Sequence, residues 1–200
     1  KELLVKYRAQ IKNYIKENPQ FQTSLEPLKV NKSADDIVKK MADDSAKAGV
    51  GPMAAVAGAI SEFVGMDLLE LSPRGNVIIE NGGDIFIKTV VPRKIGIFAG
   101  KSKFSNKLVI EILPEKTPLG VCTSSGTVGH SLSFGRADAA CVVAKSSTLA
   151  DAFATAVGNI VKTEADVQKA INFVKEIKEI IGVVVIIGDK IGIWGDIKII

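Results

Sequence analysis

Short strand-like runs separated by short gaps recur along the chain. Of all the features of the sequence, this pattern most limits the folds that the chain can adopt. Apolar and β-branched residues predict strands over residues 77–80, 85–90, 95–99, 107–112, 183–187, 191–194 and 197–200. Within each group the gaps are too short for the crossover that joins parallel strands. We therefore expect antiparallel hairpins.

Helices predicted from apolar spacing lie in blocks beside these groups of strands. Their expected ranges are 2–16, 37–47, 53–69 and 163–181. Ser33 and Asp36 resemble a capping pair for the second helix, and Pro52 is well placed as the first residue of the third. Runs of strands with long helices between them indicate an α+β fold, in which helices cover one face of antiparallel sheet. We expect a single domain, 1–200, with a helical third at 1–70 and mixed strand and helix at 71–200.

The composition favours a globular protein and argues against two kinds of partner. The chain has 200 residues, of which 46% are hydrophobic and 24% are charged, which suits one buried core. Its net charge of +4 is spread along the sequence, without the basic patch and stacking aromatics that nucleic-acid binding requires. The longest uncharged apolar stretch, 48–61, is shorter than the roughly 20 residues of a bilayer-spanning helix, so no membrane segment is expected. A cytoplasmic location is the default expectation, although the chain begins at Lys1 without a methionine and its N-terminus could be incomplete.

Residues 120–159 collect most of the side chains that could carry chemistry. Thr123 to Gly129 is a loop of hydroxyls and glycines whose backbone N–H groups could bind phosphate. The only histidine, His130, follows directly and could act as a general base or stabilise a departing phosphate, although a lone histidine is more often structural. Cys122 and Cys141 lie in apolar runs and are expected to be small buried residues without a disulfide.

Two smaller groups each allow a functional and a structural interpretation. The segment Asn81, Gly82, Gly83 and Asp84 could turn successive N–H groups toward an anion, but on its own it predicts a hairpin turn. Asp151 and Thr155 are four residues apart, so on a helix they share one face and could bind Mg²⁺ together with phosphate oxygens. Alternatively, Asp151 belongs to the first helical turn behind a Ser147 or Thr148 cap, and Thr155 bonds a carbonyl four residues back.

Taken together and in this order, three segments resemble the superfamily of ApbE-like proteins, the Mg²⁺-dependent FAD:protein FMN transferases. The segments are NGGDI at 81–85, TSSG at 123–126 and ADAFATAVG at 150–158. The similarity is greatest to a small uncharacterised branch in which the block GVCTSSGTVGHSLSFG is itself the recognisable feature. The resemblance implies an antiparallel sheet with helices on one face, like that of tunnelling-fold proteins, which agrees with the α+β pattern.

The same resemblance implies roles for the residues introduced above. Asp151 and Thr155 would be ligands of Mg²⁺, and His130 would accept the proton of an attacking hydroxyl. A flavin-nucleotide site would be lined by Asn81, Gly82, Gly83, Asp84, Thr123, Ser124, Ser125, Gly126 and Thr127. The reaction would be attack on the pyrophosphate of FAD, either by a threonine hydroxyl of an acceptor protein or by water.

The chain departs from the transferases directly after His130. They carry a His-x-x-Asp-Pro motif, whereas Ser131, Leu132, Ser133 and Phe134 follow here, and Asp138 could supply the missing aspartate. Three functions therefore remain: an enzyme acting on FAD with Mg²⁺ as FMN transferase or FAD pyrophosphatase, a non-catalytic flavin- or nucleotide-binding module, and a structural homo-oligomer pairing through the sheet edge at 197–200. The missing Asp-Pro pair favours the module over the enzyme. The retained Asp151, Thr155 and His130 favour the enzyme over the structural protein.

Overall fold

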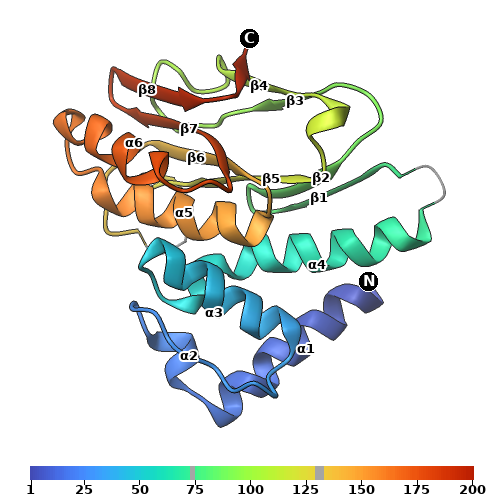
Figure 1. The fold of residues 1–200 in the computed structure, drawn as a ribbon. Helices are drawn as coiled ribbons and strands as arrows, with labels where there is room; N and C mark the ends of the chain where they lie inside the picture. The colour runs from blue at the N-terminus through green and yellow to red at the C-terminus, as the bar shows by residue number, and fades with distance from the viewer. Residues whose placement is uncertain (73–74, 129–132) are drawn as a thin grey trace.

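Two antiparallel sheets and a layer of helices make up the protein, as a computed structural model of residues 1–72, 75–128 and 133–200 shows (Figure 1). The larger sheet has six strands in the order β1-β2-β5-β6-β7-β8, and the smaller has three in the order β3-β4-β9. The larger sheet comprises β1 (Val77–Asn81), β2 (Asp84–Lys88), β5 (Leu119–Ser124), β6 (Ala139–Ala144), β7 (Ile180–Ile187) and β8 (Lys190–Gly195). The smaller comprises β3 (Arg93–Gly96), β4 (Val109–Ile112) and β9 (Lys198–Ile199). Every pairing is antiparallel, and the expected hairpins β1–β2, β3–β4 and β7–β8 form. Two other short gaps do not make hairpins, because β2 and β3, and likewise β8 and β9, lie in different sheets.

Helices cover the face of the larger sheet that points away from the smaller one (Figure 1). The helices are α1 (Glu2–Glu17), α2 (Gln20–Thr23), α3 (Asp36–Ala48), α4 (Val56–Leu71), α5 (Ser147–Ile160) and α6 (Val167–Lys175), with 3₁₀ turns η1 (Pro52–Ala55), η2 (Pro114–Lys116) and η3 (Glu164–Asp166). Helices α4, α5 and α6 contact the sheet, and α1 and α3 pack against them from outside. The α+β fold with helices on one face is thus confirmed.

Apolar side chains fill both interfaces of the larger sheet. Between this sheet and the helices, Leu149 and Phe153 of α5 are fully buried. Between the two sheets, Ile87, Ile97 and Ile110 are fully buried. Each such side chain contributes about 1.5–3 kcal/mol when it leaves water. The alternation of strand residues therefore fixes which face of the sheet each side chain occupies.

Several expected boundaries differ from the structure. Helix α3 begins at Asp36 behind Asp35 without a side-chain cap, so the expected capping pair at Ser33 and Asp36 is wrong. The helix expected over 163–181 is also wrong in its last part. Helix α6 ends at Lys175, because the residues from Ile180 onward form β7 and pair with β6. Pro52 does begin the turn η1 that leads into α4, as predicted.

One helical stretch of the described residues, Pro52–Leu71, is long and apolar enough to cross a membrane by length and composition alone. Here it packs against α5, β1 and β2, and its glycines permit close contacts. A Cβ added at Gly65 would lie 2.2 Å from the Phe86 ring. This close fit explains why a small residue stands at position 65.

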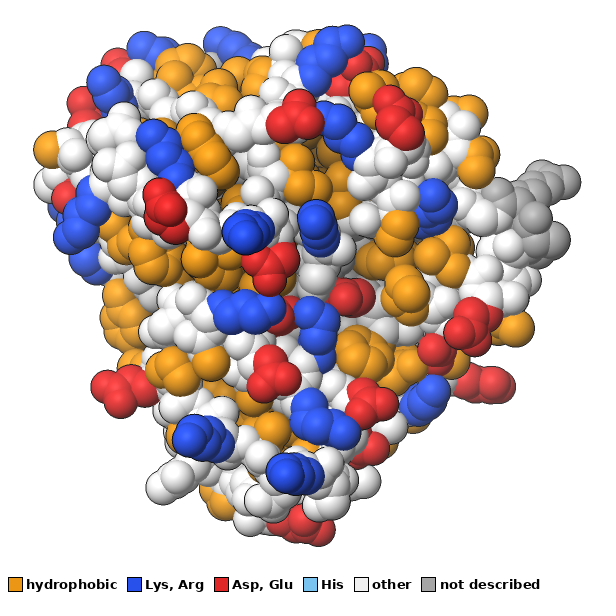
Figure 2. All heavy atoms as spheres, viewed as in Figure 1, with side chains coloured by type: hydrophobic (Ala, Val, Ile, Leu, Met, Phe, Trp, Pro, Cys, Tyr) orange, Lys and Arg blue, Asp and Glu red, His pale blue; other side chains and the backbone are white. Residues whose placement is uncertain are grey.

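Charged side chains are mixed on the face of the molecule that Figure 2 shows. Basic and acidic groups alternate across this face, which agrees with the spread of the +4 net charge along the sequence. Opposite charges therefore meet at the surface, as in the ion pair between Lys39 Nζ and Asp36 Oδ1, which are 2.8 Å apart. Pairs of this kind contribute little to stability because water screens them.

Candidate functional site

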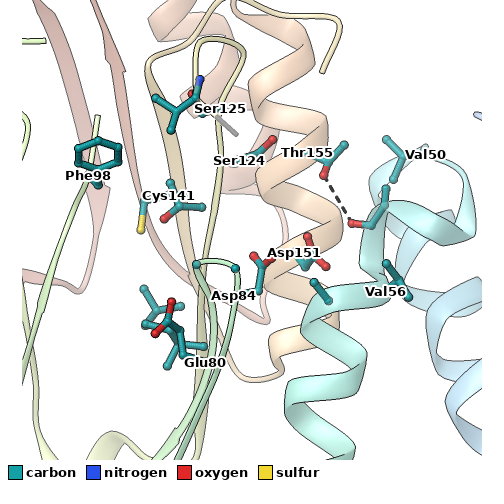
Figure 3. Close-up of a pocket in the computed structure, with 18 of the residues that line it drawn as sticks. Val50, Val56, Glu80, Asp84, Phe98, Ser124, Ser125, Cys141, Asp151 and Thr155 are labelled. Atoms are coloured by element: carbon teal, nitrogen blue, oxygen red, sulfur yellow. Dashed lines mark hydrogen bonds between the residues drawn. The ribbon is translucent and has the colours of Figure 1, made fainter. Parts of the chain in front are cut away.

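A cavity of about 1090 Å³ opens at the tip of the β1–β2 hairpin, beside the end of β5 and the first turn of α4 (Figure 3). Its helix side is lined by Asp84, Asp151 and Thr155, and the part beneath β3 by Ile85, Ile87, Val121 and Cys141. Apolar residues such as Met53 and Val56 also line it beside the carboxylates. Such a cavity suits a ligand that has one strongly polar part and one apolar, flat part.

Two buried carboxylates lie next to each other at the polar end (Figure 3). Asp84 begins β2 and is 9% exposed, and Asp151 of α5 is 8% exposed. Burial raises the pKa of Asp84 to about 7, against the opposing effect of the Cys122 thiol and the Thr123 N–H. Burial, and then the charge of Asp84, raise the pKa of Asp151 as well. Two like charges in a site with little water require a proton or a cation between them.

The N-terminus of α4 holds Asp151 in place. The Gly58 N–H, in the first turn of α4, donates to Asp151 Oδ2 at 2.9 Å. N–H groups of a first helical turn have no partner within the helix, and the helix dipole favours an anion there. This contact needs glycine, because a Cβ at Gly58 would lie 2.2 Å from Ser147 O and 2.7 Å from Asp151 Cβ.

The hairpin that carries Asp84 is also fixed to α4. Gly82 and Gly83 form its two-residue turn with φ of 67° and 103°, which only glycine adopts without strain. The Asn81 Nδ2 donates to Ala57 O at 3.3 Å, so this side chain faces α4. Gly82, Gly83 and Asp84 line the cavity, whereas Asn81 is not among its lining residues. The hairpin interpretation of this segment is therefore confirmed, and the same turn forms one wall of the cavity.

Helix α5 presents a polar face to the cavity. The structural alternatives for this face are wrong: the N-cap is Ser146, Asp151 lies beyond the first turn, and the Thr155 hydroxyl lies 3.4 Å from Ala54 O rather than bonding within its own helix. Asn159 continues the face one turn further and also lines the cavity, where its Oδ1 accepts from the Phe134 N–H at 2.9 Å. The spacing of 151, 155 and 159 could have identified Asn159 from sequence.

The hydroxyl loop contributes side chains rather than backbone donors. Thr123, Ser124 and Ser125 line the cavity, whereas Gly126 and Thr127 do not. The Ser125 hydroxyl accepts from the N–H groups of Thr127 at 3.1 Å and of residue 128 at 2.9 Å, and the Gly126 N–H donates to a carbonyl of residue 137 at 2.9 Å. The expectation that this loop offers its N–H groups to phosphate is wrong at these three positions, because the loop uses them internally.

His130 lies outside the described residues. Asp138, the expected substitute for the missing aspartate, is not among the described residues that line the cavity. Its carboxylate instead accepts from the Thr127 hydroxyl at 2.9 Å and from the Gly188 N–H at 2.7 Å. Asp138 therefore ties the hydroxyl loop to the turn between β7 and β8.

The wall that faces this polar end was not predicted from the sequence. Glu80 of β1, Arg93 and Lys94 of β3, and Phe98 line the cavity from the side of the two sheets. In sequence they are ordinary strand residues, and only the packing of β3 over the larger sheet brings them to the site. Both cysteines are buried and free, as predicted.

The donor set at the polar end fits a hard divalent cation. Within the described ranges, no cluster of three or more histidine, cysteine or acidic residues could hold a metal by itself. Asp84, Asp151 and the Thr155 hydroxyl offer oxygen ligands only, which suits Mg²⁺ with its waters and phosphate oxygens better than Zn²⁺. A cation bound between the two buried carboxylates would also reduce their mutual repulsion.

The fold defines the class of protein. The structure is similar to that of the flavinyl transferase ApbE of Pseudomonas stutzeri in its apo form, with a TM-score of 0.51 and 19% identity over 73% of this chain. It is similar to the flavin transferase ApbE of Vibrio cholerae, with a TM-score of 0.50 and 18% identity over 73% of this chain. The chain spans about half the length of these two proteins, 51% and 50%. The fold is thus that of ApbE-like proteins.

The family follows from the sequence comparisons. A family model described as AbpE bacteria matches residues 1–193, and the chain belongs to this family. The chain is 43% identical to a UPF0280 protein of Methanocella arvoryzae, over 97% of this chain and 78% of that protein. It is 45% and 44% identical to UPF0280 proteins of Methanococcus aeolicus and Methanocaldococcus jannaschii, over 98% of this chain and 81% of each.

Proposed function

We propose that the chain binds a flavin nucleotide together with Mg²⁺ in the cavity and cleaves the pyrophosphate of FAD. The products are FMN and AMP when water attacks, or AMP and a flavinylated protein when a threonine hydroxyl attacks. The carboxylate pair, Asp84 and Asp151, carries the proposal because it is buried in one cavity of an ApbE-like fold.

Each wall of the cavity has a part in this proposal. Asp84, Asp151 and Thr155 hold the cation, which neutralises charge on the phosphate oxygens when bound. The first turn of α4 keeps Asp151 oriented through the Gly58 N–H. The hydroxyl of Ser124 can donate to phosphate from the end of β5. The apolar wall beneath β3 takes the flat ring and excludes water from it.

The bond changes are those of a simple displacement. The attacking oxygen forms a bond to the phosphorus of the FMN half, the bond from that phosphorus to the bridging oxygen breaks, and AMP leaves with the electron pair. The proton of the attacking hydroxyl passes to a base, the role proposed for His130. Placement of both reactants in one cavity supplies much of the acceleration.

A binding module without chemistry is the second candidate. One observation favours it: Asp138, which could have replaced the aspartate of the transferase motif, is engaged by Thr127 and Gly188 instead. In this case the cavity binds the same nucleotide and cation, and FAD stays intact.

Incubation with FAD and Mg²⁺, followed by chromatography of AMP, separates the two candidates. The enzyme releases AMP, and Asp151→Asn lowers the rate on the order of 100-fold because it removes a charged ligand. Asp36→Asn is the matched control, since Asp36 is an exposed aspartate outside the cavity, and it keeps full activity. Quenching of FAD fluorescence without AMP release identifies the binding module. Absence of both FAD binding and AMP release refutes the proposed function.

A further inference from the structure

The two sheets pack face to face around a shared apolar core. Strand β8 passes directly into β9, so the sheets are joined along that side. On the other side, β1 is the last strand of the larger sheet and β3 the last strand of the smaller one. Both strands line the cavity, which therefore lies along the gap between two strand edges. We call this gap the β1/β3 seam and define it by Ile78 and Glu80 of β1 and by Lys94 and Gly96 of β3.

The register shows which backbone groups of β1 face the seam. Asn81 and Asp84 flank the two-residue turn, so they form a hydrogen-bonded pair. In an antiparallel pair such positions alternate, which makes Ile79 the next residue bonded to β2. The N–H and C=O groups of Ile78 and Glu80 consequently point away from β2.

The same argument applies to β3. The Ile97 N–H donates to Leu108 O at 2.9 Å, so alternation along β3 pairs Ile95 with β4 and leaves Lys94 and Gly96 pointing outward. In the part of the chain that the structure describes, the outer edges of β1 and β3 have no neighbouring strand.

The chemistry of the seam points to a polypeptide as its occupant. A row of outward N–H and C=O groups at a strand edge is a template for pairing with another strand. A nucleotide has no polypeptide backbone and cannot pair in this way. Ile78 is 46% exposed and Phe98, just beyond β3, is 53% exposed, so apolar side chains flank the edges. Glu80 on one edge and Lys94 on the other offer charges of opposite sign. An extended segment with alternating apolar and polar residues can pair with the outward groups of such an edge.

We propose that the β1/β3 seam binds an extended segment of an acceptor protein by strand addition. The seam is continuous with the polar end of the cavity at Gly82 to Asp84, so a hydroxyl on the added strand comes to lie beside the carboxylate pair. This inference rests on the proposed function, because it names the docking site of the protein acceptor.

Hydrogen exchange of single amides, measured by NMR on the protein loaded with FAD and Mg²⁺, tests the seam directly. The probe is a decapeptide selected on that protein from a phage-displayed random library with threonine fixed at its centre. Before addition of the peptide, the outward amides of Ile78, Glu80, Lys94 and Gly96 are expected to exchange faster than those of Ile79 and Ile95. The peptide is expected to slow the outward amides about tenfold or more, because they become hydrogen-bonded.

A variant with a matched control supports the assignment. Gly96→Pro removes one outward N–H and leaves the hydrogen bonds between β3 and β4 in place. It is expected to lower the affinity for the peptide about tenfold. Ile193→Pro makes the corresponding change on β8, at an outward position that does not line the cavity, and is expected to leave peptide affinity unchanged. A cooperative thermal unfolding transition shows that each variant is folded.

Three outcomes overturn the inference while leaving the proposed function intact. They are selection of no binding peptide, protection of amides outside the seam, and equal peptide binding by Gly96→Pro, each with FAD still bound. Failure of the natural protein to bind FAD and Mg²⁺ is a different result, because it refutes the proposed function itself.

Discussion

Replacement of Asp84 by asparagine should stabilise the metal-free protein at pH 8 and remove most of its response to Mg²⁺. Asp84 is 9% exposed and lies beside Asp151, so above pH 7 its ionised form is a buried charge next to a second buried carboxyl group. Asparagine has nearly the same shape and no charge. A variant that binds its cation less well but folds more stably is an uncommon combination, which makes the prediction specific.

The magnitude follows from the pKa of Asp84. Its rise from 3.8 to about 7 corresponds to about 4 kcal/mol of free energy needed to ionise the buried carboxyl. Burial of the asparagine amide costs roughly 1–3 kcal/mol where it lacks partners. The net gain in the free energy of unfolding is therefore about 1–3 kcal/mol, which for a chain of this size raises Tm by roughly 3–10 °C.

The gain depends on pH in a defined direction. Because the folded protein has the raised pKa, it binds the proton more tightly than the unfolded chain does. The stability that comes from protonated Asp84 is complete below pH 4 and is lost as the pH rises toward 7. Asp84→Asn should be about 1–3 kcal/mol less stable than the natural chain near pH 4, where only the cost of the buried amide remains, and more stable above pH 7.

Thermal unfolding in EDTA and in Mg²⁺ at both pH values measures these effects. Saturating Mg²⁺ should raise the Tm of the natural chain, since only the folded state binds it, and should shift Asp84→Asn much less. Asp36→Asn is the control and should behave like the natural chain in every condition. A lower stability of Asp84→Asn in EDTA at pH 8, or an undiminished Mg²⁺ shift, would refute the reasoning.

Three further predictions concern the surroundings of the site. Gly58→Ala should lower the free energy of unfolding in urea by about 1–3 kcal/mol, because its Cβ would lie 2.2 Å from a carbonyl of α5; an unchanged unfolding midpoint would contradict this close packing. Glu62→Gln should cost about 1–2 kcal/mol by the same measurement, because the Glu62 carboxylate accepts from the Thr148 N–H and hydroxyl at 2.9 and 2.8 Å; an equally stable variant would show that its charge is unimportant. Cys122 and Cys141 should react with a thiol reagent such as Ellman's only after unfolding, because both are buried and burial raises the pKa of Cys141 to about 11; rapid reaction of the native protein would contradict their burial.

Local sequence signals predicted most elements of the fold, and tertiary pairing accounts for the errors. Short gaps between apolar runs predicted the hairpins β1–β2, β3–β4 and β7–β8, but they did not show that β3 and β9 leave the larger sheet. The apolar positions near Ile180 fit both a helix and a strand, and pairing with β6 decided for the strand. The expected cap at Ser33 failed because the capping signal is weak on its own.

In the site, too, contacts within one element could be predicted from sequence, whereas contacts between distant segments could not. Asp151 and Thr155 share a helix, so their spacing alone predicted a common face. Asp84 joins them only because the hairpin tip is bonded to α4, a contact between distant segments. The internal bonds of the Ser125 hydroxyl were equally invisible in sequence, because a hydroxyl can bond to its own loop as readily as to a ligand.

Anomalous diffraction from crystals grown with Mn²⁺ and FAD tests the central claim most directly, because Mn²⁺ takes the oxygen ligands of Mg²⁺ and is visible at its absorption edge. The account predicts one strong peak at the polar end of the cavity, in contact with the carboxylates of Asp151 and Asp84 and with the phosphates of the nucleotide. FAD bound in the cavity without a peak at these carboxylates, or a Mn²⁺ peak at another site alone, would contradict it.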